Sequence, residues 1–155
     1  MPPKFLFLGV GNRDRGDDAV GPRVAEKLAA DPVFQRLNVD ILSHGGEGAS
    51  LMDLWQGTRK TVIVDAMKSG AVVGTVRRID ANADRLESGV FHYSSHLFGV
   101  AEAVEMARQL DRLPEALVIF GIEGRIYDFG APLSPEVESA LEDVTVQVKR
   151  EFADA

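Results

Sequence analysis

Apolar segments with strand character alternate with helical segments along the chain, and this alternation is the feature that most constrains the fold. Five segments have the composition of buried or edge strands: 4–10, 39–43, 60–66, 74–79 and 116–121. Apolar residues recur at helical spacing in four others: 22–30, 51–55, 97–110 and 134–152. Strands connected through helices pair in parallel, and the helices cover both faces of the sheet. We therefore predict a three-layer α/β/α sandwich with a mainly parallel five-stranded sheet, in which Arg77 and Arg78 mark an edge strand.

Composition limits the function classes that this fold can serve. A chain of 155 residues with 45% hydrophobic residues predicts one globular domain over residues 1–155. The absence of cysteine excludes thiolate metal sites and a cysteine nucleophile, and it fits a cytoplasmic protein. A formal net charge of −7 opposes binding to nucleic-acid phosphates. The apolar segment near the start is too short for a signal peptide, and no segment approaches membrane-spanning length, so we expect no membrane insertion.

Two adjacent carboxylates, Asp17 and Asp18, follow the first predicted strand after a turn that contains Gly9 and Gly11. Loops at the carboxyl ends of parallel strands are where α/β proteins place their chemistry. Aspartate is also a preferred N-cap, so the pair could simply begin the next helix. A helix with Pro22 at its first position would leave both acids in the loop.

Other polar residues follow the remaining parallel strands and should lie at the same rim of the sheet. They are Asn12, His44, Glu47, Asp65 and Glu123. His96 precedes the helix predicted at 97–110 and should lie near this rim as a neutral imidazole, because the helix dipole opposes its protonation. Two carboxylates and one imidazole would form a divalent-metal site.

Each of these residues also has a structural interpretation. Asp65 could initiate a turn, and His96 could be a packed or solvated residue. His44 is either a cleft residue or a turn residue, and Glu47 is a candidate substrate contact.

The ordered motifs GVGN, DDAVGP, VDA, SSHLFG and GIEG, with LSPEVESAL downstream, resemble those of the hydrogenase maturation proteases. These endopeptidases trim the C-terminal extension from the large subunit of nickel–iron hydrogenases. The resemblance spans nearly the whole chain and implies that Asp18, Asp65 and His96 are the metal-binding and catalytic residues. Asp17 is then left with a capping or loop-shaping role. Some family members carry glutamate where this chain has Asp18, and the family often has threonine in the glycine loop where this chain has Glu47.

The resemblance further implies an aspartyl-type endopeptidase whose partner is a nickel-loaded large-subunit precursor. Nickel would arrive with that substrate, although zinc or another divalent cation could occupy the same ligands. Without metal, Asp18 and Asp65 would repel each other, and one of them should have a raised pKa. Our mechanistic hypothesis is that the metal docks the substrate tail and polarises the scissile carbonyl or a water, while one aspartate acts as base. A conventional zinc protease is disfavoured because HExxH is absent, and Ser94 and Ser95 lack a GxSxG context.

Two other classes remain open from the residues alone. One is a magnesium-dependent phosphohydrolase that would use Asp14, Asp17, Asp18 and Asp65. The other is a non-enzymatic nucleotide-binding module in which phosphate would rest on Gly9, Gly11 and Gly16. The glycine spacing departs from GxGxxG, and carboxylates crowd the position that a phosphate would take.

Overall fold

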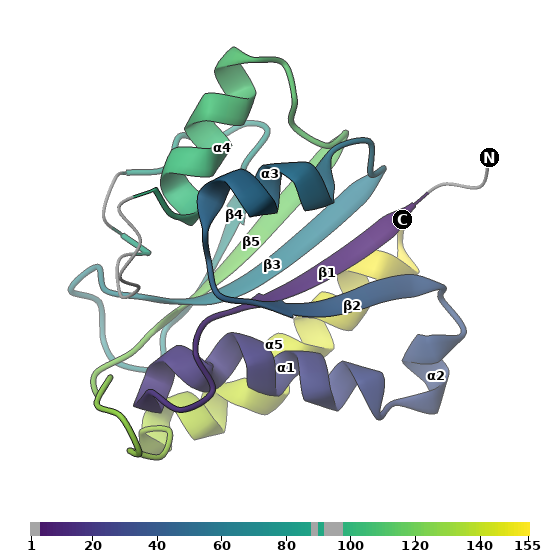
Figure 1. The fold of residues 1–155 in the computed structure, drawn as a ribbon. Helices are drawn as coiled ribbons and strands as arrows, with labels where there is room; N and C mark the ends of the chain where they lie inside the picture. Colours follow the sequence, from purple (N-terminus) through teal and green to yellow (C-terminus); the bar gives the residue numbers. More distant parts are fainter. Residues whose placement is uncertain (1–3, 88–89, 92–97) are drawn as a thin grey trace.

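A computed structural model describes residues 4–87, 90–91 and 98–155, and it contains the predicted five-stranded sheet (Figure 1). The strands are β1 (Phe5–Val10), β2 (Val39–His44), β3 (Lys60–Met67), β4 (Val76–Asp80) and β5 (Ala116–Glu123). Their order across the sheet is β2-β1-β3-β5-β4. All neighbouring pairs are parallel except β4 with β5, which is antiparallel and places β4 at the edge as expected.

Helices cover both faces of the sheet, which confirms the three-layer sandwich (Figure 1). On one face lie α1 (Val20–Ala29) and α5 (Pro135–Ala153), and on the other lie α3 (Gly48–Trp55) and α4 (Val100–Gln109). The predicted helix 97–110 corresponds to α4, but Phe98 and Gly99 precede the helix in the structure, and Leu97 lies outside the described residues. No helix within the described residues is both long enough and apolar enough to cross a membrane.

A short helix, α2 (Pro32–Gln35), was not predicted. Asp31 and Pro32 were interpreted as the end of the preceding helix. They instead begin a new one, because the Asp31 carboxylate accepts the backbone N–H of Val33 at 2.9 Å and proline occupies the first turn.

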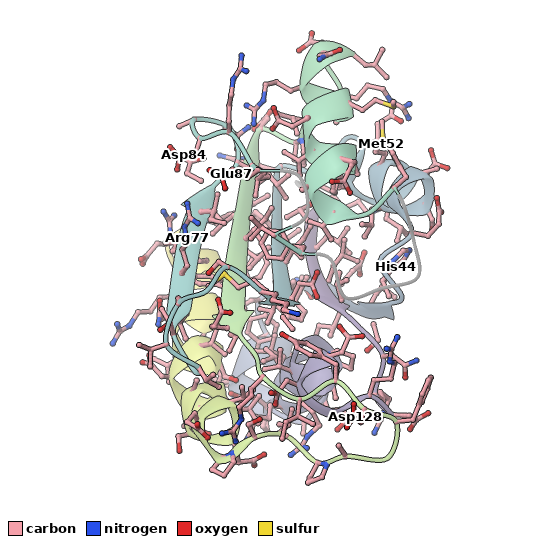
Figure 2. The ribbon with its side chains drawn as sticks, turned by 90° about the vertical axis from the view of Figure 1, so that its left-hand side faces the viewer. His44, Met52, Arg77, Asp84, Glu87 and Asp128 are labelled. Atoms are coloured by element: carbon pink, nitrogen blue, oxygen red, sulfur yellow. The ribbon has the colours of Figure 1, made fainter. Side chains whose placement is uncertain are left out.

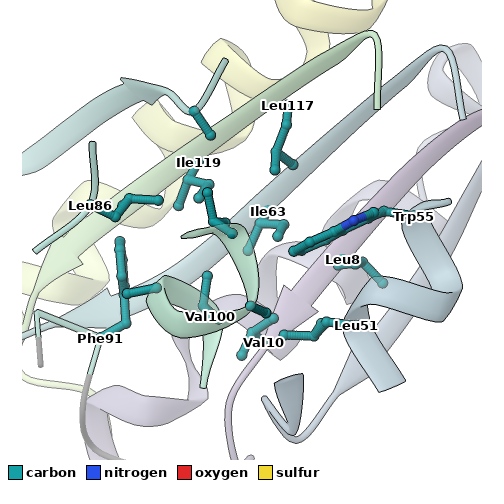
Figure 3. Close-up of a cluster of buried hydrophobic side chains, with 14 of the residues drawn as sticks. Leu8, Val10, Leu51, Trp55, Ile63, Leu86, Phe91, Val100, Leu117 and Ile119 are labelled. Carbon is teal, nitrogen blue, oxygen red and sulfur yellow. The ribbon is translucent and has the colours of Figure 1, made fainter. Parts of the chain in front are cut away.

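Alternate residues of the strands point to opposite faces and build two separate apolar cores. Leu8, Ile63 and Ile119 pack against α3 and α4 around Trp55 (Figure 3). Phe7, Val62, Val64 and Phe120 pack against α1 and α5. Burial on both faces explains why β3 and β5 have nearly continuous apolar sequences.

A glycine contact between β1 and α1 fixes the chain at the carboxyl rim of the sheet. A Cβ atom on Gly9 would collide with the carbonyl of Gly21, and one on Gly21 would collide with the carbonyl of Val10. Helix α1 therefore packs directly on the backbone of β1. The intervening residues are drawn into a compact turn over the ends of the strands.

Candidate functional site

The carboxyl ends of β1, β2, β3 and β5 form the rim at which the predicted site residues lie. Figure 2 views the molecule from the side of this rim, with His44 and Arg77 on opposite sides of it. The turn after β1 contains a 3₁₀ helix, η1 (Gly16–Ala19), and both neighbouring acids belong to it. Helix α1 begins directly afterwards at Val20, so Pro22 is its third residue and not its first.

Asp18 and Asp65 are brought together in one small cavity. Both are nearly fully buried, with 6% and 4% of their surfaces exposed. Asp65 lies near the end of β3, on the face covered by α3 and α4, and Asp18 reaches the same cavity from η1. The cavity has a volume of about 10 Å³, and the glycine loop after β2 and Phe91 also line it. A volume of this size accommodates about one water molecule or a single ion.

Burial and mutual repulsion disfavour two negative charges in this cavity. Burial raises the pKa of Asp18 above its usual range, against the opposing effects of the Asn12 N–H, which donates to Oδ2 at 2.9 Å, and of nearby Arg15. Burial also raises the pKa of Asp65 well above its usual range, and the charge of Asp18 raises it further. These directions agree with the raised pKa expected for a metal-free pair. Such a pair is stabilised by taking up either a proton or a cation.

His96, the third predicted ligand, lies outside the described residues. Among residues 4–87, 90–91 and 98–155, no group of three His, Asp or Glu side chains is arranged to hold a metal ion. Phe98 is the first described residue after His96, and its carbonyl accepts the N–H of Gly48 at 2.9 Å. A Cβ atom on Gly48 would collide with the Phe98 ring, so this glycine allows the start of α4 to pack on the loop after β2.

Asp17 does not face the cavity, although it is adjacent to Asp18. Its side chain is fully buried, and its carboxylate accepts the N–H groups of Arg125, Ile126 and Ser134 and the hydroxyl of Ser134, at 2.7 to 3.0 Å. Burial would raise its pKa, but these four donors outweigh that effect and lower it. The predicted loop-shaping role is thus confirmed, and the capping role is not, since α1 has no side-chain N-cap.

His44 and Glu47 have local structural roles that the sequence did not reveal. The Gly46 N–H donates to Nδ1 of His44, which places the proton of the neutral ring on Nε2, 2.9 Å from Ser50 Oγ. Glu47 is the N-cap of α3, and its carboxylate accepts the N–H groups of Ala49 and Ser50 at 2.9 Å each. Helix α3 begins at Gly48, three residues before the predicted apolar face at Leu51, so Glu47 was expected in the loop and not at the start of the helix.

Glu123 and Arg15 also contribute to the rim. Glu123 is buried at the end of β5, and its carboxylate accepts the N–H and the hydroxyl of Ser69. Arg15 was not singled out from the sequence. Its guanidinium lies 4.9 Å from the centre of the exposed Phe129 ring, and its Nε donates to the Tyr127 carbonyl at 3.3 Å.

Together, the fold and the cavity define an α/β protein with a buried aspartate pair in a small cavity at its carboxyl rim. A family model described as HycI, hydrogenase maturation protease, matches residues 22–151. That range covers most of the sequence, and the chain belongs to this family. The matched range includes Asp65 and begins shortly after Asp18.

Individual relatives agree with this assignment. The chain is 29% identical over 140 residues to the hydrogenase expression/formation protein HupD of Thiocapsa roseopersicina, covering 90% of this chain and 63% of that protein. It thus spans less than two thirds of that relative's length. It is also 26% identical over 145 residues to the hydrogenase 2 maturation protease of Escherichia coli, covering 94% and 88% of the two chains. The solved structure of the hydrogenase maturating endopeptidase HybD from E. coli superposes with a TM-score of 0.79 at 25% identity, covering 97% and 93%.

Proposed function

We propose that this protein is an endopeptidase that removes the C-terminal extension of a nickel–iron hydrogenase large-subunit precursor after nickel insertion. Family membership supports this proposal, as does the likeness to proteins named as hydrogenase maturation proteases. The proposed catalytic and metal-binding residues are Asp18, Asp65 and His96. The partner is the nickel-loaded precursor.

The observation that carries the proposal is the burial of Asp18 and Asp65 in one cavity. Their raised pKa values mean that the doubly charged pair is unfavourable without a cation. Two carboxylate oxygens with one imidazole nitrogen suit borderline divalent ions such as nickel or zinc. The two described residues therefore fit the metal, and His96 would complete the set.

In the proposed reaction the nickel belongs to the substrate. A divalent ion bound between the aspartates would supply Lewis-acid polarisation of the scissile carbonyl or of an attacking water. The Asn12 N–H orients the Asp18 carboxylate, and the apolar side chains of Phe91 and Val100 limit access of bulk water to the cavity. One of the two aspartates accepts the proton of the attacking water, since a raised pKa makes a carboxylate a better base.

Two alternative functions, the magnesium-dependent phosphohydrolase and the nucleotide-binding module, are less well supported than the protease. For the nucleotide-binding module, the glycines should form an open cradle. Instead, a Cβ atom on Gly11 would collide with the Asp18 carbonyl, and one on Gly16 would collide with the Ile126 carbonyl. Both glycines are needed for packing within the protein, and family membership favours the protease over both alternatives.

The test is to incubate the protein with the nickel-loaded precursor of the hydrogenase encoded with it and to measure the mass of the large subunit. We expect loss of the C-terminal extension from the nickel-loaded precursor and none from the nickel-free one. His96→Ala should abolish cleavage, whereas Asp40→Asn, on the exposed side of β2, should not change it. Absence of cleavage by the unmodified protein, or full activity of His96→Ala, would contradict the proposal.

A further inference from the structure

A second hollow lies beside the aspartate cavity at the other side of the rim. It is an open groove of about 600 Å³ between the loop 68–71, which follows β3, and the start of the edge strand β4. Arg77 on β4 lines one side, and Glu87 and Val90 lie along another. Figure 2 shows Arg77 at the sheet edge with Glu87 above it. Grooves of this volume are in the range that binds small molecules and short peptides.

Strand register places this groove next to the proposed catalytic residues. Asp65 on β3 and Arg77 on β4 both have Gly121 of β5 as their Cα partner. Asp65 and Arg77 are therefore separated by two strand spacings, about 10 Å, and their side chains lie on the same face of the sheet. A Cβ atom on Gly121 would be 2.7 Å from Met67 Sδ and 3.1 Å from the Phe91 ring, so these two side chains fill the space between Asp65 and Arg77.

The groove and the cavity share a dividing wall. Phe91 lines the cavity, and its neighbour Val90 lines the groove. The Lys68 N–H donates to the Val90 carbonyl at 2.9 Å, which fixes this wall to the end of β3. A chain that crosses the wall would therefore pass from one hollow directly into the other.

The loop that forms the groove is held in place before any ligand binds. The buried Glu123 carboxylate accepts both the N–H of Ser69 and its hydroxyl, at 3.0 and 2.6 Å. The Gly124 N–H donates to the Met67 carbonyl at 3.1 Å. A preformed wall lowers the entropic cost of binding a flexible peptide.

The charges of the groove differ from those of the chain as a whole. The chain has a net charge of −7, yet the described residues that line the groove include Lys68 and Arg77 and one carboxylate, that of Glu87. The neighbouring Arg78 pairs with Glu151 of α5 on the other face, at 2.7 and 3.2 Å. Arg77, by contrast, forms no ion pair with any residue that the structure describes.

We propose that this groove binds the part of the substrate on the carboxyl side of the scissile bond, with Arg77 and Lys68 contacting a carboxylate of that segment. The inference rests on the proposed function, because only a C-terminal extension provides such a segment beside the aspartates. A segment of this kind always carries a terminal α-carboxylate, and acidic side chains would add to it. The outer edge of β4 has no strand neighbour among residues 4–87, 90–91 and 98–155, so an extended peptide can lie along it and use its backbone groups.

The competing interpretation is that Arg77 only protects an edge strand from pairing with other chains. The two interpretations differ in a binding experiment with Arg77→Gln, with Arg77→Lys as the charge-preserving variant and Arg59→Gln as control. Arg59 is exposed and lies just before β3, at the opposite rim. The probe is a fluorescent synthetic peptide with the sequence of the cognate extension, prepared with a free and with an amidated C-terminus, and its affinity is measured by anisotropy.

If the groove binds the extension, Arg77→Gln weakens peptide binding about five- to tenfold, Arg77→Lys weakens it less, and Arg59→Gln leaves it unchanged. Loss of affinity on amidation identifies the terminal carboxylate as the ligand, and retained affinity identifies an acidic side chain. In the cleavage assay, Arg77→Gln raises KM by a similar factor with kcat unchanged. Equal peptide affinity of Arg77→Gln and Arg59→Gln would overturn the groove proposal even if the precursor is cleaved. Absence of cleavage by the unmodified protein would overturn the proposed function alone.

Discussion

Asp17 and Asp18 are adjacent in the same 3₁₀ turn and both are buried, yet their pKa values shift in opposite directions. Asp17 accepts four hydrogen bonds from the region 125–134. Asp18 accepts one from Asn12 and faces another carboxylate. The difference shows that the donors around a buried acid, more than its burial, decide whether it is an anchor or a binding group.

The largest expected effect is on catalytic activity, and it distinguishes the cavity of Asp18 and Asp65 from the anchor, which is Asp17 with its hydrogen bonds to residues 125–134. Asp65→Asn should lower the rate of precursor cleavage by about 1,000-fold or more, because it removes a proposed metal ligand and a candidate base. The fold should persist, since the substitution also removes the repulsion between Asp65 and Asp18. Cleavage kinetics and circular dichroism measure the two properties. Wild-type activity of Asp65→Asn would show that the cavity is not the catalytic site.

The next effect concerns stability at the anchor. Asp17→Ala should lower the free energy of unfolding by about 3 kcal/mol, because it leaves the N–H groups of Arg125, Ile126 and the buried Ser134 without their acceptor. Urea denaturation at pH 7 measures this loss. Asp18→Asn is the matched control, and it should leave stability nearly unchanged. Equal losses in the two variants would mean that the two acids have similar structural roles.

The pH dependence of stability should differ in sign between the two regions. The folded pKa of Asp65 is raised above 3.8, so the native state holds a proton that the unfolded state loses, and stability falls as pH rises from 3.8 through the folded pKa. For Asp17 the folded pKa is lowered below 3.8, so its contribution is present above 3.8 and is lost as pH falls through the folded pKa. Urea denaturation with a chelator present should show that Asp65→Asn removes a decline of about 1 kcal/mol per pH unit. An unchanged slope would contradict the assignment of that decline to Asp65.

The smallest effect tests whether Glu47 belongs to the site or to its support. Glu47→Ala should lower the free energy of unfolding by about 0.5–1 kcal/mol because α3 loses its N-cap. Its kcat and KM for the precursor should remain within twofold of the unmodified protein. Glu47→Asp, which keeps a carboxylate suited to capping, should recover most of the stability. A large rise in KM with full stability would instead make Glu47 a substrate contact.

Most of the fold could be predicted from the sequence because strands and helices alternate with distinct periodicities. The strand at 60–66, KTVIVDA, has the continuous apolar composition that burial on both faces demands, and β3 occupies Lys60–Met67. The helix α2 was missed because Asp31 and Pro32 are equally typical of the end of one helix and the start of another. The start of α1 was misplaced because a 3₁₀ turn precedes it, which leaves no sequence pattern of its own.

The location of the site at the carboxyl rim of the sheet could be predicted from the sequence, but the individual hydrogen bonds of its residues could not. Asp18 and Asp65 could be placed together because the ends of parallel strands meet at one edge, and the adjacency of β1 and β3 confirms it. The partners of Asp17 are backbone groups, which carry no signal in residue identity. The place of His96 in the proposed site remains a prediction.

The hydrogen bonds of Asp17 also have a consequence for the biosynthesis of this protein. Its partners lie 108 to 117 residues further along the chain. A ribosome must therefore synthesise and expose residue 134 before the acidic turn can be anchored. Closing so long a loop is slow compared with forming local helices. The nascent chain consequently cannot anchor the acidic turn at residues 16–19 until residues 125–134 have been synthesised.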